Sequence, residues 1–339
     1  MAKKLKNILQ YLFFLGLGFF LIWWSLDGLT EQDTEQISDA ISRGNYIWVI
    51  PGLTLILLSH WVRALRWRML IEPLGYSPSK LNTFFAVMVG YLANLAVPRL
   101  GEVLRCSALT KYEKIPLDKL AGTVILERII DTICLLIVFA LALALQPNLY
   151  QNIIETFFGK PNAQGSNNLF LYLIISVVIL LCGIGMFVLF CSKKNNGLAV
   201  QLKKIALHVW QGLISIKSLK KPGLFIFQSL AIWAMYTVSV IIGFMLLQET
   251  QQYGITEALT VLSAGTLAMA ATPGGIGAYA FLVQKTMFLY HLNGGIGLAL
   301  GWMLWILQVC IVLIVGGLSL IGLPFLNRKE SKTAINQLS

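Results

Sequence analysis

The stretch GYLANLAVPRLG at residues 90–101 has a counterpart in GTLAMAATPGGIG at residues 265–277. The first nine positions align without a gap and share a glycine, a leucine, two alanines and a proline. Each stretch interrupts an apolar run, at about 81–110 and about 256–290. Proline removes a backbone donor and glycine permits close backbone approach, so helices are predicted to break at both points.

Six other segments are apolar along their whole length. Each provides the roughly 20 residues of helix that a hydrocarbon core about 30 Å thick requires; they are about 7–26, 46–68, 117–146, 168–191, 223–247 and 296–324. The chain is 57% hydrophobic and only 12% charged, whereas soluble proteins are about 25% charged. We therefore predict an all-α polytopic membrane protein with about six full transmembrane helices plus two Pro/Gly-broken re-entrant hairpins, or up to eight spans if these cross.

Positive charge predicts the orientation of the chain. Lysine and arginine concentrate in five segments, which are the N-terminus, 61–80, 98–119, 192–222 and the C-terminal tail. Because cytoplasmic loops carry such an excess, both termini are expected in the cytoplasm, with the protein in the cell (inner) membrane. The same distribution accounts for the net charge of +11 without a nucleic-acid partner.

This orientation places the two broken runs on opposite sides of the membrane. Limbs of roughly 10–17 residues would span about 15–25 Å at 1.5 Å per residue, which favours re-entrant hairpins, although charge alone does not separate them from full crossings. Each broken run lies between two long apolar segments. The sequence thus predicts an inverted repeat with units at about 46–146 and 223–324.

The predicted organisation along the chain has four parts. A transmembrane helix at 1–26 is favoured over a signal peptide, because its apolar run is long and no A-x-A site follows. An acidic outer loop at 27–45, expected to be a solvated amphipathic segment, precedes the membrane domain at 46–325 and a cytoplasmic tail at 326–339. The spacing of apolar residues at 197–217 predicts either a helix that lies on the inner leaflet or an ordinary connecting helix.

The tips of the two hairpins are the expected binding site. Non-helical backbone inside a membrane must be covered by protein or line a wet cavity, and paired breaks in inverted repeats mark midplane sites in transporters. Free N–H and C=O groups at the tips, with helix N-termini, would suit an anionic headgroup. The alternative is that proline and glycine merely kink packed helices.

Three charged residues, Glu127, Arg128 and Asp131, lie well inside the apolar segment 117–146. A charge at the bilayer centre costs about 2.5–3.5 kcal/mol on insertion scales. We expect these residues either to line a functional cavity or to form a structural ion pair that fixes the bundle.

Basic residues also lie near the first break and at the end of the second apolar segment. Arg99 and Arg105 are expected either to bind phosphate through their guanidinium groups or to anchor the chain at the inner headgroups. His60, Arg63 and Arg66 are expected to snorkel toward the inner headgroups.

No pattern of a catalytic or cofactor site is found in the sequence. DxD, HExxH, GxSxG and P-loop motifs are absent. The five cysteines form no CxxC pair and are interpreted as small apolar residues; they are Cys106, Cys134, Cys182, Cys191 and Cys310. We predict no catalytic residue, no metal and no cofactor.

These motifs together resemble the membrane region of the lysylphosphatidylglycerol synthases, a family of flippase-like integral membrane proteins. The resemblance covers about 46–325 and is carried by Asn94 with PRLGEVLR at 98–105, ERIID at 127–131 and TPGGIG at 272–277. The family often has an acidic residue where this chain has Ala280. The cytoplasmic aminoacyl-transferase domain of the best-known relatives is expected to be lacking, and lysyl-lipid synthesis with it.

The resemblance implies a membrane domain that moves a lipid between leaflets. The candidate headgroup site comprises Asn94, Pro98, Arg99, Gly101, Glu102, Arg105, Glu127, Arg128, Asp131, Thr272, Pro273, Gly274, Gly275 and Gly277. The expected substrate is a (phospho)lipid or lipid-linked intermediate with an anionic or phosphate-bearing headgroup. Assembly as a homo-oligomer is compatible with this function. The alternatives are a membrane-embedded lipid-modifying enzyme and an accessory subunit of a cell-envelope enzyme.

Overall fold

The computed structural model describes residues 2–27, 29–146 and 219–336. The chain divides into two compact units, Met1–Ile125 with Gly223–Ser339, and Leu126–Pro222. The described part is helical without strands, which confirms the predicted all-α polytopic fold. Its helices are α1 (Ala2–Asp27), α2 (Glu31–Ser42), α3 (Val49–Ile71), α4 (Lys80–Ala96), α5 (Leu100–Glu113), α6 (Leu117–Leu145), α10 (Pro222–Phe244), α11 (Ile255–Ala271), α12 (Ala278–Phe288) and α13 (Gly294–Asn336).

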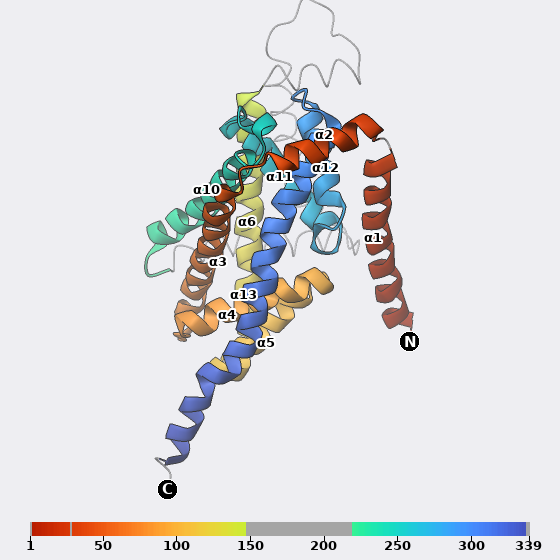
Figure 1. Ribbon diagram of the computed structural model, residues 1–339. Helices are drawn as coiled ribbons and strands as arrows, with labels where there is room; N and C mark the ends of the chain where they lie inside the picture. Colours follow the sequence, from red (N-terminus) through yellow and green to blue (C-terminus); the bar gives the residue numbers. More distant parts are fainter. Residues whose placement is uncertain (1, 28, 147–218, 337–339) are drawn as a thin grey trace, which may run out of the picture. The chain divides into compact units, whose positions relative to one another are not determined.

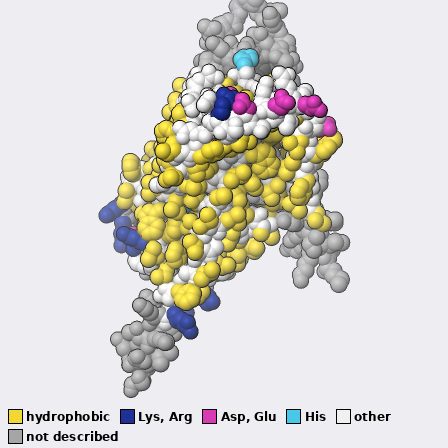
Figure 2. Space-filling view, viewed as in Figure 1, with side chains coloured by type: hydrophobic (Ala, Val, Ile, Leu, Met, Phe, Trp, Pro, Cys, Tyr) yellow, Lys and Arg dark blue, Asp and Glu magenta, His cyan; other side chains and the backbone are white. Residues whose placement is uncertain are grey.

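Four of the described helices are long and apolar enough to cross a membrane. They are Tyr46–Leu74, Leu117–Leu145, Pro222–Phe244 and Gly294–Arg328, and they match four of the six predicted spans. The first predicted span corresponds to α1, whose apolar part is Phe14–Asp27. The predicted span 168–191 and the predicted amphipathic helix 197–217 lie outside the described residues. Figure 2 shows the broad hydrophobic surface of these helices.

Both broken runs form helical hairpins, as the proline and glycine positions predict. The limbs α4 and α5 pack against each other, and so do α11 and α12. The limbs have 17, 14, 17 and 11 residues, which is about 16–26 Å at 1.5 Å per residue. Each limb is thus shorter than a hydrocarbon core of about 30 Å, which fits the predicted re-entrant hairpins.

The first hairpin turns at Pro98 and the second at Pro273, as predicted. At the first turn Val97 is extended and Arg99 has a left-handed backbone with φ of 67°. At the second turn a short 3-10 helix, η6 (Pro273–Gly275), separates the limbs, and Gly274, Gly275 and Gly277 all have positive φ. Glycine adopts this conformation without steric cost, which explains why three glycines follow the second proline.

The two hairpins approach each other from opposite ends of the long helix α13 (Figure 1). In the first half of α13, Gly297 faces Gln284 and Gly301 faces Ala280, both on α12. In the second half, Gly316 faces Leu92 of α4, and Gly322 faces the Phe85 ring.

Both partner helices therefore run antiparallel to α13. The base of the second hairpin lies at the start of α13, whereas the base of the first lies near Asn327, which exchanges hydrogen bonds of 3.0 Å with Asn82. The two tips consequently converge on the middle of α13.

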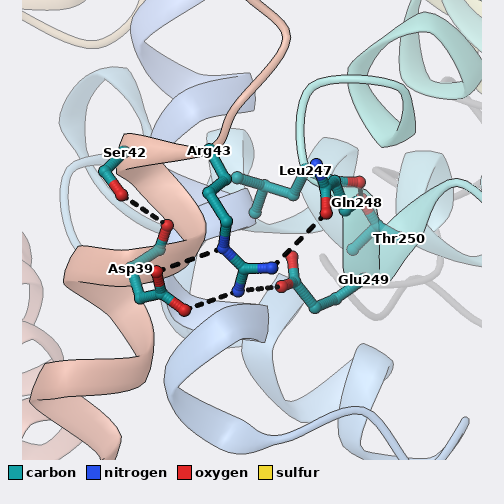
Figure 3. Close-up of polar contacts among 7 residues, drawn as sticks. All are labelled: Asp39, Ser42, Arg43, Leu247, Gln248, Glu249 and Thr250. Atoms are coloured by element: carbon teal, nitrogen blue, oxygen red, sulfur yellow. Dashed lines mark hydrogen bonds and ion pairs between the residues drawn. The ribbon is translucent and has the colours of Figure 1, made fainter.

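The acidic segment after α1 forms the amphipathic helix α2, which packs on α13. Thr30 and Asp33 cap its N-terminus reciprocally through hydrogen bonds of 2.9 and 3.2 Å. At its other end Arg43 contacts Asp39 at 2.6 Å and reaches Gln248 and Glu249 at 3.4 and 3.3 Å (Figure 3). These contacts tie α2 to the loop between α10 and α11.

Candidate functional site at the meeting of the hairpin tips

The two hairpin tips touch. A Cβ placed on Gly274 would lie 3.0 Å from Leu95 Cδ2 and 3.4 Å from Leu95 Cα, so η6 packs directly on the end of α4. Any side chain at Gly274 would also be strained, because its φ is 60°. The contact therefore depends on glycine at this position. It joins two helix breaks, at Pro98 and Pro273, that lie 175 residues apart in the sequence.

The second tip is buried and its carbonyl groups are satisfied within the protein. Trp305 of α13 donates its indole N–H to the Gly274 carbonyl at 2.8 Å. The Gly275 N–H donates to the Thr272 carbonyl at 3.0 Å, and the Thr272 hydroxyl donates to the Ile276 carbonyl at 3.1 Å. The expectation that both tips present free carbonyl groups is wrong for these atoms, because helix α13 supplies a donor and the tip bonds to itself.

Helix α1 covers another side of the second tip. Gly18 is buried, and a Cβ there would lie 2.7 Å from the Ile276 carbonyl oxygen. A Cβ on Gly277 would collide with the Gly18 carbonyl oxygen. Gly277 therefore serves close backbone packing between α1 and the tip.

The first tip differs because its turn is exposed. Pro98 and Arg99 are exposed, whereas Gly101 is buried. The Asn94 side chain accepts a hydrogen bond of 2.8 Å from the Gly101 N–H, which closes the turn across the start of α5. Asn94 and Gly101 thus hold the turn, and Arg99 is the charged residue that it presents.

Behind the first tip, Arg105 of α5 is buried at 4% exposure. Its guanidinium lies 4.6 Å from the centre of the Trp67 ring, a distance typical of a cation–π contact. The Trp67 indole N–H donates to the Thr123 hydroxyl at 2.9 Å. Glu102, one turn earlier, is half-buried.

His60, Arg63 and Arg66 are buried, and the prediction that they snorkel to the headgroups is wrong. Arg63 donates to the Tyr236 hydroxyl at 3.2 Å and Arg66 to the Ser229 hydroxyl at 3.3 Å, both on α10. The His60 ring lies 4.6 Å from that of Tyr91 on α4. These side chains point into the helix bundle because α10 and α4 offer polar partners there. With Arg105, they form a buried basic cluster between α3, α4, α5 and α10.

The three charged residues of α6 lie in the second unit, Leu126–Pro222. Glu127 and Asp131 are buried at 0% and 9% exposure, and Arg128 is half-buried. Each of the three has an interaction partner. The burial of Glu127 and Asp131 fits the high cost of exposing a charge to lipid.

Two signals in the sequence point to residues that the prediction missed. A tryptophan inside an apolar span needs an acceptor for its indole N–H, which would have marked Trp67 and Trp305. Residues 56, 60, 63 and 67 are spaced by three or four along α3, and this spacing places them on one helix face. All four are buried, so the basic residues belong to the inward stripe.

The described residues contain no group of His, Cys, Asp and Glu that could hold a metal ion. The architecture defines a multi-pass helical membrane protein in which two broken hairpins meet. The chain belongs to the family described as the lysylphosphatidylglycerol synthase TM region, which matches residues 7–326 and confirms the predicted family.

A curated relative is the UPF0104 membrane protein MJ1595 of Methanocaldococcus jannaschii. It is 33% identical over 101 residues, which is 29% of this chain. The matched part spans 30% of the length of that relative. No solved structure matches this chain.

Proposed function

We propose that this protein translocates a lipid with an anionic or phosphate-bearing headgroup between the leaflets of the cytoplasmic membrane, with both termini in the cytoplasm. The observation that carries the proposal is the contact between Gly274 and Leu95. Two breaks that approach from opposite ends of α13 meet near its middle, so the exposed turn of the first hairpin lies beside the buried turn of the second. Broken segments paired in this way mark substrate sites in transporters.

The chemistry of the first tip suits a phosphate group. Arg99 is exposed on the turn, and a guanidinium can bind two phosphate oxygens at once. The buried residues His60, Arg63, Arg66 and Arg105 lie behind this tip, and Arg99 is the charged residue that reaches its surface.

The second tip supports the same proposal by providing a rigid counterpart. Its turn is fixed by the hydrogen bond from Trp305 and by close packing on Gly18. A polar headgroup would then pass the exposed first tip while its acyl chains stay in lipid. Transport in this scheme is passive or ion-coupled.

The test is lipid translocation in liposomes that contain only this protein, followed with a fluorescent phospholipid. We expect faster exchange between leaflets than in protein-free liposomes. Arg99→Gly should reduce the rate roughly tenfold, because a charge-assisted hydrogen bond contributes about 1.5–3 kcal/mol. Glycine accepts the φ of 67° at this position, so the variant should fold.

Arg99→Lys is the matched variant, since it keeps the charge but loses the planar fork; its rate should lie between those of the wild type and Arg99→Gly. A wild-type rate equal to that of protein-free liposomes would contradict the proposed function. A folded Arg99→Gly variant with the wild-type rate would contradict the role of the first tip.

A further inference from the structure

A cavity of about 350 Å³ lies far from the hairpin tips, at the end of the first unit where α1 meets α2, α12 and the start of α13. Its lining includes Asp27, Asp33, Gln284 and Lys285, with Trp24 and Phe288 at its sides. Its volume is in the range of small-ligand sites. Figure 2 shows acidic side chains gathered at this end of the molecule and basic ones mainly toward the other.

The lining includes a buried polar side chain, that of Gln284. Gln284 is 6% exposed, and its side-chain amide donates to the Gly294 carbonyl at 3.1 Å. Among the described residues its Oε1 has no hydrogen-bond partner. Gln284 lines the cavity, and a buried acceptor without a donor is costly, so a ligand donor that reaches Oε1 would stabilise it.

The two aspartates of the cavity differ in their availability. Asp33 is committed to structure, because it accepts hydrogen bonds from Thr30 and from the Asn293 side chain at 2.9 Å. Asp27 has no hydrogen bond or ion pair in the described part of the chain. Asp27 and Gln284 Oε1 are therefore the free acceptors, and they suit a primary ammonium group, which carries three donors.

The anionic part of a ligand would meet Lys285. The first N–H groups of α13 are already occupied, since Gly295 and Ile296 both donate to the Asn293 side chain, at 2.7 and 3.3 Å. Lys285 is exposed and contacts the Phe281 ring at 5.4 Å. It forms no ion pair within the described ranges, so its ammonium is available.

The rim of the cavity fits the depth of a lipid headgroup. Trp24 is 52% exposed and Phe288 is 64% exposed, and both flank charged residues. Exposed aromatic and charged side chains occur together at the interface between bilayer and water. A lipid headgroup would be held here while its acyl chains lie along the apolar face of α1.

We propose that this cavity binds a zwitterionic lipid headgroup with a primary ammonium and a phosphate. The ammonium donates to Asp27 and Gln284 Oε1, and the phosphate accepts from Lys285. The site is separate from the hairpin tips, and its occupancy can be measured at equilibrium without transport. Failure of this proposal would therefore leave the proposed translocation untouched, and the converse also holds.

The test titrates short-chain dihexanoyl phosphatidylethanolamine into the detergent-solubilised full chain and measures heat. We expect saturable binding that Lys285→Gln and Asp27→Asn each weaken about tenfold, as expected for loss of one charge-assisted hydrogen bond. Matched variants at exposed positions outside the cavity, Lys220→Gln and Glu35→Gln, should bind as the wild type does.

Dihexanoyl phosphatidylglycerol lacks the ammonium and the corresponding phosphatidylcholine lacks its N–H donors, so both should bind at least about tenfold more weakly. Equal binding of all three lipids, or wild-type affinity in both cavity variants, would overturn the proposal. Free phosphoethanolamine carries the same headgroup without acyl chains, so it distinguishes binding of a lipid from binding of the soluble headgroup. An affinity equal to that of the lipid would overturn the assignment to a lipid.

Discussion

Two glycine pairs allow close backbone approaches within the described residues. Within the first hairpin, a Cβ on Gly101 would collide with the Gly90 carbonyl oxygen, and one on Gly90 would lie 2.9 Å from the Gly101 carbonyl oxygen. Between the second tip and α1, Gly277 and Gly18 approach in the same way. Each pair lets two backbones touch where a side chain would hold them apart.

Gly101→Ala should therefore destabilise the protein. The added methyl meets backbone, which cannot rotate away, and overpacking of this kind costs about 1–3 kcal/mol or more. The control is Gly317→Ala on α13, where nothing lies within 4 Å of the new methyl and alanine favours the helix by about 0.5–1 kcal/mol. Thermal denaturation in detergent should show a lower midpoint for the first variant alone; equal midpoints would contradict the close approach.

Helix α2 is held at both of its ends. Its N-terminus is fixed by the reciprocal cap of Thr30 and Asp33 and by the bond from Asn293 to Asp33. Its C-terminal end is fixed by Arg43, which reaches Glu249 (Figure 3). Exposed ion pairs contribute little, so the N-terminal cap is expected to be the stronger attachment.

This cap predicts a pH dependence. The hydrogen bond from Asn293, followed by those from the Thr30 backbone and hydroxyl, lowers the pKa of Asp33 from its usual 3.8. A lowered pKa in the folded state means that the stabilisation is present above the usual value and is lost as pH falls through the lowered one. Hydrogen-exchange protection of α2 should then be constant from pH 7 to about pH 5 and fall in more acidic solution.

Asp33→Asn provides the control for this measurement. It should reduce protection of α2 at neutral pH, because the reciprocal cap with Thr30 is weakened, and should weaken the acid-induced decline. An identical decline in the wild type and the variant would assign the effect to other carboxylates.

The sequence predicted the breaks and the hairpins because their causes are local. Proline and glycine act on their own backbone, and the limb lengths follow from their positions. The burial of Arg63 and Arg66 was not predicted, because their partners Tyr236 and Ser229 lie 173 and 163 residues away. The difference between an exposed first tip and a buried second tip likewise depends on Trp305 and Gly18, which no local pattern connects to the tips.

Across the first unit, α13 is the common support of both hairpins. Its first half packs on α12 and its second half on α4, and the tips meet between them. The proposed translocation site depends on this arrangement, because it places the two breaks at one position along α13. The family membership over residues 7–326 is compatible with this arrangement but does not specify it.

The most direct test of this opposition labels the bases of the two hairpins from one side of the membrane. Ser77 precedes α4 and Gln251 precedes α11, and both are exposed. Ser77→Cys and Gln251→Cys, each in a chain whose five native cysteines are replaced, would be treated in oriented membranes with an impermeant maleimide. We predict that Cys at 251 reacts from the outside and Cys at 77 only from the cytoplasmic side; reaction of both from the same side would contradict the opposed hairpins.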